Sequence, residues 1–130
     1  MKKLKEKGFT LIEVVIVLAI GALIILVVIQ AVSAARRSQR DNARKSEAGQ
    51  IAALLDQYAS NNGGVYPSNA NFATFLGDYS EELDDKGYTD VASCPGTVDP
   101  EDYLVRYSRP STHSYNLDVC LEVGGEVEVQ

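Results

Sequence analysis

The strongest constraint on this chain is an unbroken apolar run over residues 14–29, which follows a lysine-rich stretch and a single acid, Glu13. The 21 residues from position 9 to position 29, at about 1.5 Å each in a helix, match a hydrocarbon core about 30 Å thick. The run therefore predicts a membrane-spanning helix. An ionised carboxylate inside a bilayer costs roughly 2.5–3.5 kcal/mol, so Glu13 predicts a function and a charged partner.

A charged partner for Glu13 arises if the chain is cut between Gly8 and Phe9. The cut creates an α-ammonium group on Phe9, about one helical turn before Glu13. Opposite charges at this spacing compensate each other, within one chain or between neighbouring chains.

Two simpler readings of the N-terminal segment leave Glu13 unexplained. A secretory signal peptide has an apolar core of about 7–15 residues and a small-residue cleavage site. Residues 31–34 supply such a site, but the apolar core here is longer. An uncleaved membrane anchor fits the length of the run and gives Glu13 no role.

The sequence Gly8-Phe9-Thr10-Leu11-Ile12-Glu13 after a short basic leader resembles the class III signal of type IV pilins and pseudopilins. The resemblance covers about the first thirty residues. It implies that a prepilin peptidase removes residues 1–8 and N-methylates Phe9. It also implies that Glu13 and Phe9 guide docking of the subunit into a helical filament, which an assembly platform and its ATPase extrude.

Charge is distributed unevenly beyond the apolar run. Residues 30–49 carry five basic and two acidic side chains, net +3, whereas residues 50–130 carry three basic and fourteen acidic ones, net −11. The acidic part argues against direct nucleic-acid binding by the head, because such recognition begins with a basic patch. The basic stretch, residues 36–45, predicts a solvated face near the membrane that contacts anionic headgroups before assembly.

The apolar run is expected to continue as one long helix to Asn61, because residues 30–61 hold no proline and one glycine. Residues 9–29 would form its transmembrane or filament-core half. Residues 30–61 would form an amphipathic outer half, with one packing stripe made by Ile51, Leu54, Leu55 and Tyr58. The Asn-Asn-Gly-Gly sequence over residues 61–64 predicts the helix end.

Residues 62–130 are long enough for one small globular head. Residues 62–100 read as a connection with two short helical turns, one capped by Asn69 or Asn71 and the other starting at Ser80. The first turn would bury Phe72, Phe75 and Leu76 as a satellite core. Residues 101–130 are expected to form an antiparallel sheet. Apolar and polar side chains alternate there as far as Val123, and the Gly-Gly pair at 124–125 is typical of a tight hairpin turn.

These elements predict an α+β, pilin-like fold. A small antiparallel sheet of about three strands would pack against the long N-terminal helix.

Cys94 and Cys120 are the only cysteines, and an even count in an exported chain predicts a disulfide. By strand alternation Cys120 points away from the apolar face, so the bond would pin the connection to the outer side or edge of the sheet. The alternative is two unrelated buried thiols. The resemblance adds that pilin disulfides often bound a variable surface region.

Residues for catalysis, a cofactor or a metal site are not apparent in the sequence. His113 is the only histidine, and neither a nucleophile elbow nor a phosphate-binding loop occurs. Six acids raise the alternative of a calcium loop, but their spacing matches no EF-hand and favours a solvated loop. These acids are Asp84, Asp85, Asp90, Asp99, Glu101 and Asp102.

The function predicted from the sequence is structural: a non-enzymatic subunit that polymerises through its N-terminal helix into a type IV pilus or a similar filament. It would sit in the cytoplasmic membrane with its head outside before assembly into an extracellular pilus. The alternatives are a pseudopilin of a type II secretion or DNA-uptake system, in a periplasmic or wall-spanning pseudopilus, and a monomeric membrane-anchored binding module.

Overall fold

The structure, a computed structural model, describes residues 8–79, 81–83, 86–122 and 124–129. The chain divides into two compact units, Met1–Arg36 and Arg37–Gln130. One α-helix, α1 (Leu11–Asn61), contributes to both units.

The first unit contains the apolar part of α1, and its side chains are exposed. Phe9 is 91% exposed and Leu11 84%, and every large apolar side chain on to Val32 is exposed as well. The helix is long and apolar enough to cross a membrane. Because burying one such side chain is worth about 1.5–3 kcal/mol, this surface is stable only against lipid or other apolar helices.

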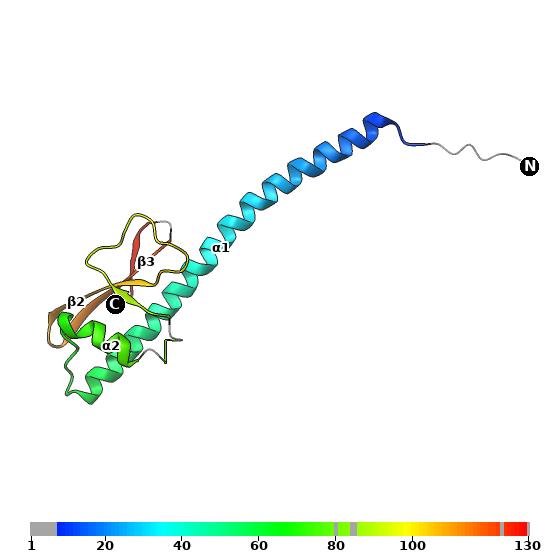
Figure 1. The fold of residues 1–130 in the computed structure, drawn as a ribbon. Helices are drawn as coiled ribbons and strands as arrows, with labels where there is room; N and C mark the ends of the chain where they lie inside the picture. The colour runs from blue at the N-terminus through cyan, green and yellow to red at the C-terminus, as the bar shows by residue number, and fades with distance from the viewer. Residues whose placement is uncertain (1–7, 80, 84–85, 123, 130) are drawn as a thin grey trace, which may run out of the picture. The chain divides into compact units, whose positions relative to one another are not determined.

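The second unit is an α+β head built around the C-terminal part of α1 (Figure 1). A 3₁₀ turn, η1 (Asn69–Asn71), leads into α2 (Phe72–Asp78). The strands are β1 (Thr89–Asp90), β2 (Leu104–Ser111), β3 (Ser114–Cys120) and β4 (Glu126–Glu128). They form a sheet in the order β1-β2-β3-β4.

The predicted α+β fold with its long helix is confirmed, and the sheet is mixed. Strands β2, β3 and β4 pair antiparallel, as their alternating sequence predicts, and β1 adds a parallel strand beside β2. Thr89 N donates to Tyr103 O at 2.9 Å and Val91 N donates to Val105 O at 2.8 Å. A two-residue strand inside an irregular connection has no period to detect, which is why the sequence did not reveal it.

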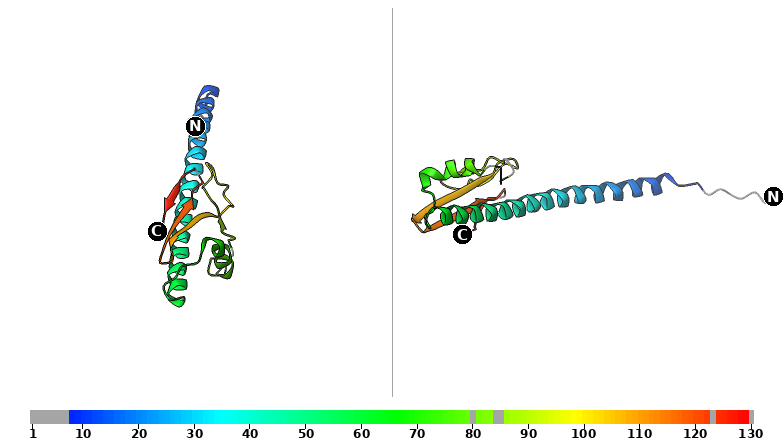
Figure 2. Two further views of the ribbon diagram at one scale, coloured as in Figure 1. Left: turned by 90° about the vertical axis from the view of Figure 1, so that its left-hand side faces the viewer. Right: turned by 90° about the horizontal axis from the view of Figure 1, so that it is seen from below.

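The core lies between α1 and the inner face of the sheet. Ile51 and Leu55 are 0% exposed on the helix side, and Val105 and Leu117 are 0% exposed on the sheet side. The turned views in Figure 2 show the strands lying alongside the C-terminal part of α1. The stripe predicted from the helical period is therefore the surface on which the head is built, with Leu54 and Tyr58 partly buried at its border.

The aromatic residues of α2 belong to this main core, so the predicted satellite core is wrong. Phe72 is 0% exposed and stacks on Tyr107 of β2, with ring centroids 4.0 Å apart. Neither expected asparagine cap forms: Asn71 makes no side-chain cap hydrogen bond, and Asn69 Oδ1 accepts from Arg109 N at 2.9 Å instead. Asn69 thereby ties the turn to β2.

Several positions named in the sequence analysis lie outside the described residues. These are leader residues 1–7, the expected cap Ser80, the acids Asp84 and Asp85, and Val123.

The close approach of two backbones requires glycine at position 124. Gly124 has φ +70°, and a β-carbon placed there would overlap the carbonyl oxygen of Gly96. We predict that Gly124→Ala lowers the free energy of unfolding by roughly 1–3 kcal/mol, measured by urea denaturation of the full chain in detergent.

Gly49 in α1 is the matched control for Gly124. It is exposed, and a β-carbon there meets no atom within 4 Å. Gly49→Ala should stabilise by about 0.5–1 kcal/mol. A Gly124→Ala variant as stable as the parent chain, or stabilised as Gly49→Ala should be, would contradict the prediction.

Candidate assembly site

Thr10 and Glu13 cap the N-terminus of α1 reciprocally. Thr10 N donates to Glu13 Oε2 at 2.9 Å, and Glu13 N donates to Thr10 Oγ1 at 3.4 Å. This is a capping box, in which two orphan helix donors are satisfied by side chains three residues apart. The Thr10-x-x-Glu13 spacing is the sequence signal typical of this motif. Glu13 therefore has a local structural role in addition to any role in assembly.

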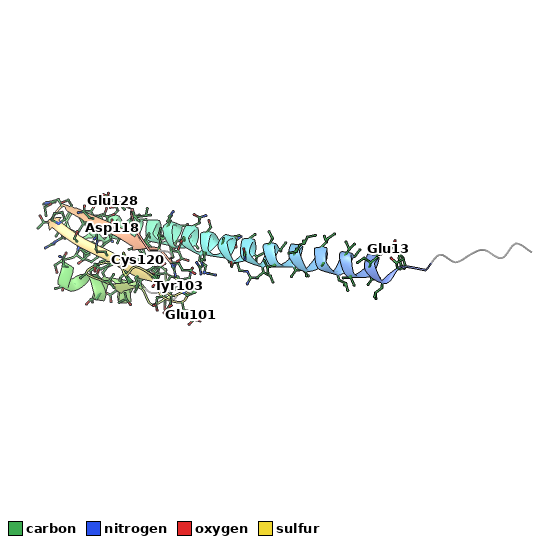
Figure 3. All side chains as sticks on the ribbon, turned by 90° about the horizontal axis from the view of Figure 1, so that it is seen from above. Glu13, Glu101, Tyr103, Asp118, Cys120 and Glu128 are labelled. Atoms are coloured by element: carbon green, nitrogen blue, oxygen red, sulfur yellow. A yellow bond between two sulfur atoms is a disulfide. The ribbon has the colours of Figure 1, made fainter. Side chains whose placement is uncertain are left out.

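The surface around Glu13 is apolar and hollowed. Figure 3 shows Glu13 close to the N-terminal end of α1. A depression of about 480 Å³ is lined by Glu13, Phe9, Val14, Val17 and Leu18. A carboxylate at the border of such a surface can accept a hydrogen bond from a cation while apolar groups pack beside it.

The predicted cleavage site lies outside the helix. Gly8 and Phe9 are exposed and non-helical, and α1 begins at Leu11. A β-carbon built on Gly8 would meet no atom within 4 Å. The Gly8–Phe9 bond is thus accessible in a non-helical segment next to the capping box.

A disulfide joins Cys94 to Cys120, with Cα atoms 5.3 Å apart. Cys120 shares its face of β3 with Asp118, the face turned from the α1 core, and is nevertheless 0% exposed. The segment after Cys94 lies next to the end of β3, since Val98 N donates to Glu122 O at 3.3 Å. Closing 26 residues of chain is worth about 3.5 kcal/mol in the chain-entropy model.

Glu122, just after β3, is surrounded by arginines of α1, a group called here the basic clamp (Arg37, Arg40, Arg44, Asp41 and Glu122). Arg40 donates to both carboxylate oxygens of Glu122 at 2.7 Å. Arg37 and Arg44 lie 3.8 and 3.9 Å from the same carboxylate. Asp41 Oδ1 accepts from Glu122 N at 2.9 Å and from Arg44 Nη1 at 3.2 Å.

Arg44 is the most buried member of the clamp, with 2% of its surface exposed. Its Nη2 donates to Asp99 O at 2.9 Å, to Asp102 O at 3.1 Å and to Pro100 O at 3.4 Å. These bonds tie the end of the connection to α1. The prediction of a wholly solvated basic face is therefore wrong for Arg44, while Lys45 is exposed.

The clamp lowers the pKa of the Glu122 carboxyl below its usual range. The hydrogen bonds from Arg40 are the largest cause, and the charges of Arg40, Arg44 and Arg37 act in the same direction against desolvation. The same contacts raise the pKa of Arg40. The pair is therefore ionised at neutral pH.

The described acids of the candidate calcium loop form no obvious ligand set. Asp99, Glu101 and Asp102 are exposed, and residues 8–79, 81–83, 86–122 and 124–129 contain no group of three His, Cys, Asp or Glu side chains arranged for a metal ion. His113 is exposed in the turn between β2 and β3, where its Nδ1 lies 2.9 Å from Thr112 Oγ1.

Comparison with known proteins identifies the N-terminal segment. Residues 3–29 match the family model described as the prokaryotic N-terminal methylation motif, the class III signal peptide of type IV pilins. No curated protein and no solved structure gives a significant match to the chain. The chain thus carries the signal of a type IV pilin-like precursor, and the motif indicates a structural, non-enzymatic protein.

The buried guanidinium of Arg44 should be a main determinant of head stability. Arg44→Ala removes the buried donor that three backbone carbonyls and Asp41 share, so we predict a loss of about 3 kcal/mol in the free energy of unfolding. Lys45→Ala, one residue on and exposed, should change it by less than about 0.5 kcal/mol. The measurement is urea denaturation. If both variants lost the same free energy of unfolding, the buried bonds of Arg44 would be unimportant for the stability of the head.

The stability of the head should fall at acid pH because of Glu122. A carboxyl whose folded pKa is depressed stabilises the fold above its unfolded pKa, about 4.3, and this contribution disappears as pH falls through the folded pKa. Glu122→Gln should therefore be less stable at neutral pH and lose less stability on acidification. The exposed Glu128→Gln is the control. Thermal unfolding across pH would refute this if Glu122→Gln and the parent lost stability in parallel.

Proposed function

We propose that this protein is a structural subunit of a type IV pilus or a closely related filament. One observation carries the proposal: residues 3–29 match the N-terminal methylation motif, and the part of α1 within this match, from Leu11 onward, exposes large apolar side chains in all directions. A helix that is apolar all round is stable in a bilayer or in a bundle of like helices. The same segment would therefore serve as membrane anchor first and filament core afterwards.

In the proposed assembly, Glu13 fixes the direction in which neighbouring helices point and their position along the filament axis. After cleavage, the Phe9 ammonium of one subunit would meet the Glu13 carboxylate of a neighbour in an apolar environment, where an uncompensated charge is costly. The capping box leaves room for this pairing. Thr10 N binds Glu13 Oε2, and Oε1 has no hydrogen-bond partner among the described residues.

The other proteins needed are those that the motif implies. A prepilin peptidase would remove residues 1–8 and methylate Phe9, and an assembly platform with its ATPase would extrude the subunits. The head would lie outside the cytoplasmic membrane, an orientation supported by the Cys94–Cys120 disulfide, because disulfides persist in oxidising compartments.

A pseudopilin carries the same N-terminal signal and would polymerise by the same contacts into a shorter assembly. Filaments released into the medium favour the pilus. A defect in protein secretion or DNA uptake without released filaments favours the pseudopilin. Monomers with an uncleaved N-terminus would instead indicate a membrane-anchored binding module.

The experiment that tests the proposal is mass spectrometry of the N-terminal peptide in material sheared from cells. N-methylated Phe9 in a sedimentable fraction is the expected result, since it reports processing and polymerisation together. An intact Met1 leader confined to the membrane would overturn the proposal.

Substitutions at Glu13 separate its charge from its capping role. Glu13→Gln keeps a capping side chain, because glutamine serves in capping boxes, but removes the charge. We predict normal processing and strongly reduced filament yield for Glu13→Gln, as for Glu13→Ala. Thr10→Val removes the reciprocal hydroxyl and keeps the charge, and it should assemble better than either. Normal assembly of Glu13→Gln with failure of Glu13→Ala would assign Glu13 to capping alone.

A further inference from the structure

The end of α1 presents an unusual peptide bond. Asn62 and Gly63 form the one Asn-Gly pair in the sequence, directly after the last helical residue, Asn61. Both residues are exposed, and a β-carbon built on Gly63 would meet no atom within 4 Å.

The backbone nitrogen of Gly63 differs from its neighbours in its hydrogen bonds. Asn62 N donates to Tyr58 O at 3.0 Å and Gly64 N donates to Ala59 O at 2.7 Å. The Gly63 N–H donates to no acceptor among the residues that the structure describes. Gly63 has no side chain to shield this nitrogen, and at φ +68° the residue belongs to a turn outside the helix. This nitrogen is therefore open to solvent and free to react.

We propose that Asn62 is a site of spontaneous deamidation. The Gly63 nitrogen gives its proton to a base in the solvent and attacks Cγ of Asn62. A new N–Cγ bond forms, the bond from Cγ to the side-chain nitrogen breaks, and that nitrogen takes up a proton from the solvent and leaves as ammonia. Water then opens the five-membered succinimide at either carbonyl, giving aspartate or isoaspartate. The net reaction consumes one water, releases one ammonia and needs no enzyme, oxidant or cofactor.

The reaction removes a cap from α1. Asn62 Nδ2 donates to Tyr58 O at 2.8 Å, which gives this carbonyl of the last helical turn a side-chain donor besides the backbone bond from Asn62 N. The carboxylate product cannot donate this side-chain bond, and its negative charge lies at the unfavourable end of the helix dipole. The affected turn carries Tyr58, whose ring packs edge-on against Phe75 with centroids 5.7 Å apart. Deamidation should therefore loosen the end of α1 where it supports the core.

The modification itself does not depend on the proposed function, although its consequence in a filament does. A subunit that stays in an assembly is not replaced, so modified Asn62 would accumulate with the age of the filament. Failure to find deamidation would leave the filament proposal untouched, and an uncleaved N-terminus would leave the chemistry at Asn62 untouched.

The test is peptide mapping of the full chain in detergent, kept in mildly alkaline and mildly acidic buffer and sampled over time. We expect a mass increase equal to the exchange of NH for O, confined to Asn62, faster in alkaline buffer and accompanied by isoaspartate. Asn61 and Asn71 are internal controls, because they precede Asn62 and Phe72 rather than glycine. An unmodified Asn62, or equal modification at Asn61 and Asn71, would overturn the proposal.

Two variants complete the experiment. Asn62→Gln keeps an amide but cannot form the five-membered ring, so its peptide should not change mass in the same time. Asn62→Asp reproduces one product and should lower the thermal midpoint of the head relative to the parent chain. A midpoint equal to that of the parent would refute the proposed effect on the helix end.

Discussion

A single helix has to satisfy two different surroundings, and the rest of the structure follows from this constraint. Up to Val32, α1 exposes large apolar side chains on every side, which suits lipid or like helices. From Ala48 onward it buries one stripe, through Ile51 and Leu55, under a sheet. The change from all-round to one-sided hydrophobicity within one continuous element gives the chain both a segment suited to apolar surroundings and a folded head.

Between these regions the helix carries charges that belong to the head. Arg40 and Arg44 reach the loop after β3 and the connection before β2, two segments far apart in sequence. Figure 3 shows Tyr103, at the end of that connection, and Cys120, at the end of β3, on the same part of the head. The disulfide, the clamp and the contact of Gly124 with Gly96 all act on these segments. An irregular connection is thus fixed by a few specific bonds rather than by regular secondary structure.

The sequence predicted the features that rest on periodicity and on a strong motif. The stripe through Ile51 and Leu55, the antiparallel strands and the signal over residues 3–29 all follow from patterns local in sequence. Features that depend on contacts between distant segments were not accessible. Arg44 looked like a surface residue because nothing in its neighbourhood identifies three carbonyls 55 to 58 residues away. Strand β1 has two residues and exists only because β2 lies beside it. The capping box could have been predicted from the spacing of Thr10 and Glu13, because it is local in sequence. The prediction for Glu13 rested on its charge alone.

The bonds of Arg44 also bear on how the head responds to its medium. Its guanidinium gathers backbone carbonyls of one loop around a positive charge, an arrangement for which many extracellular loops use a dissolved ion. A positive charge that is covalently part of the chain cannot be diluted, exchanged or removed by a chelator. A head built in this way keeps its loop in place whether the surrounding solution is rich or poor in divalent cations.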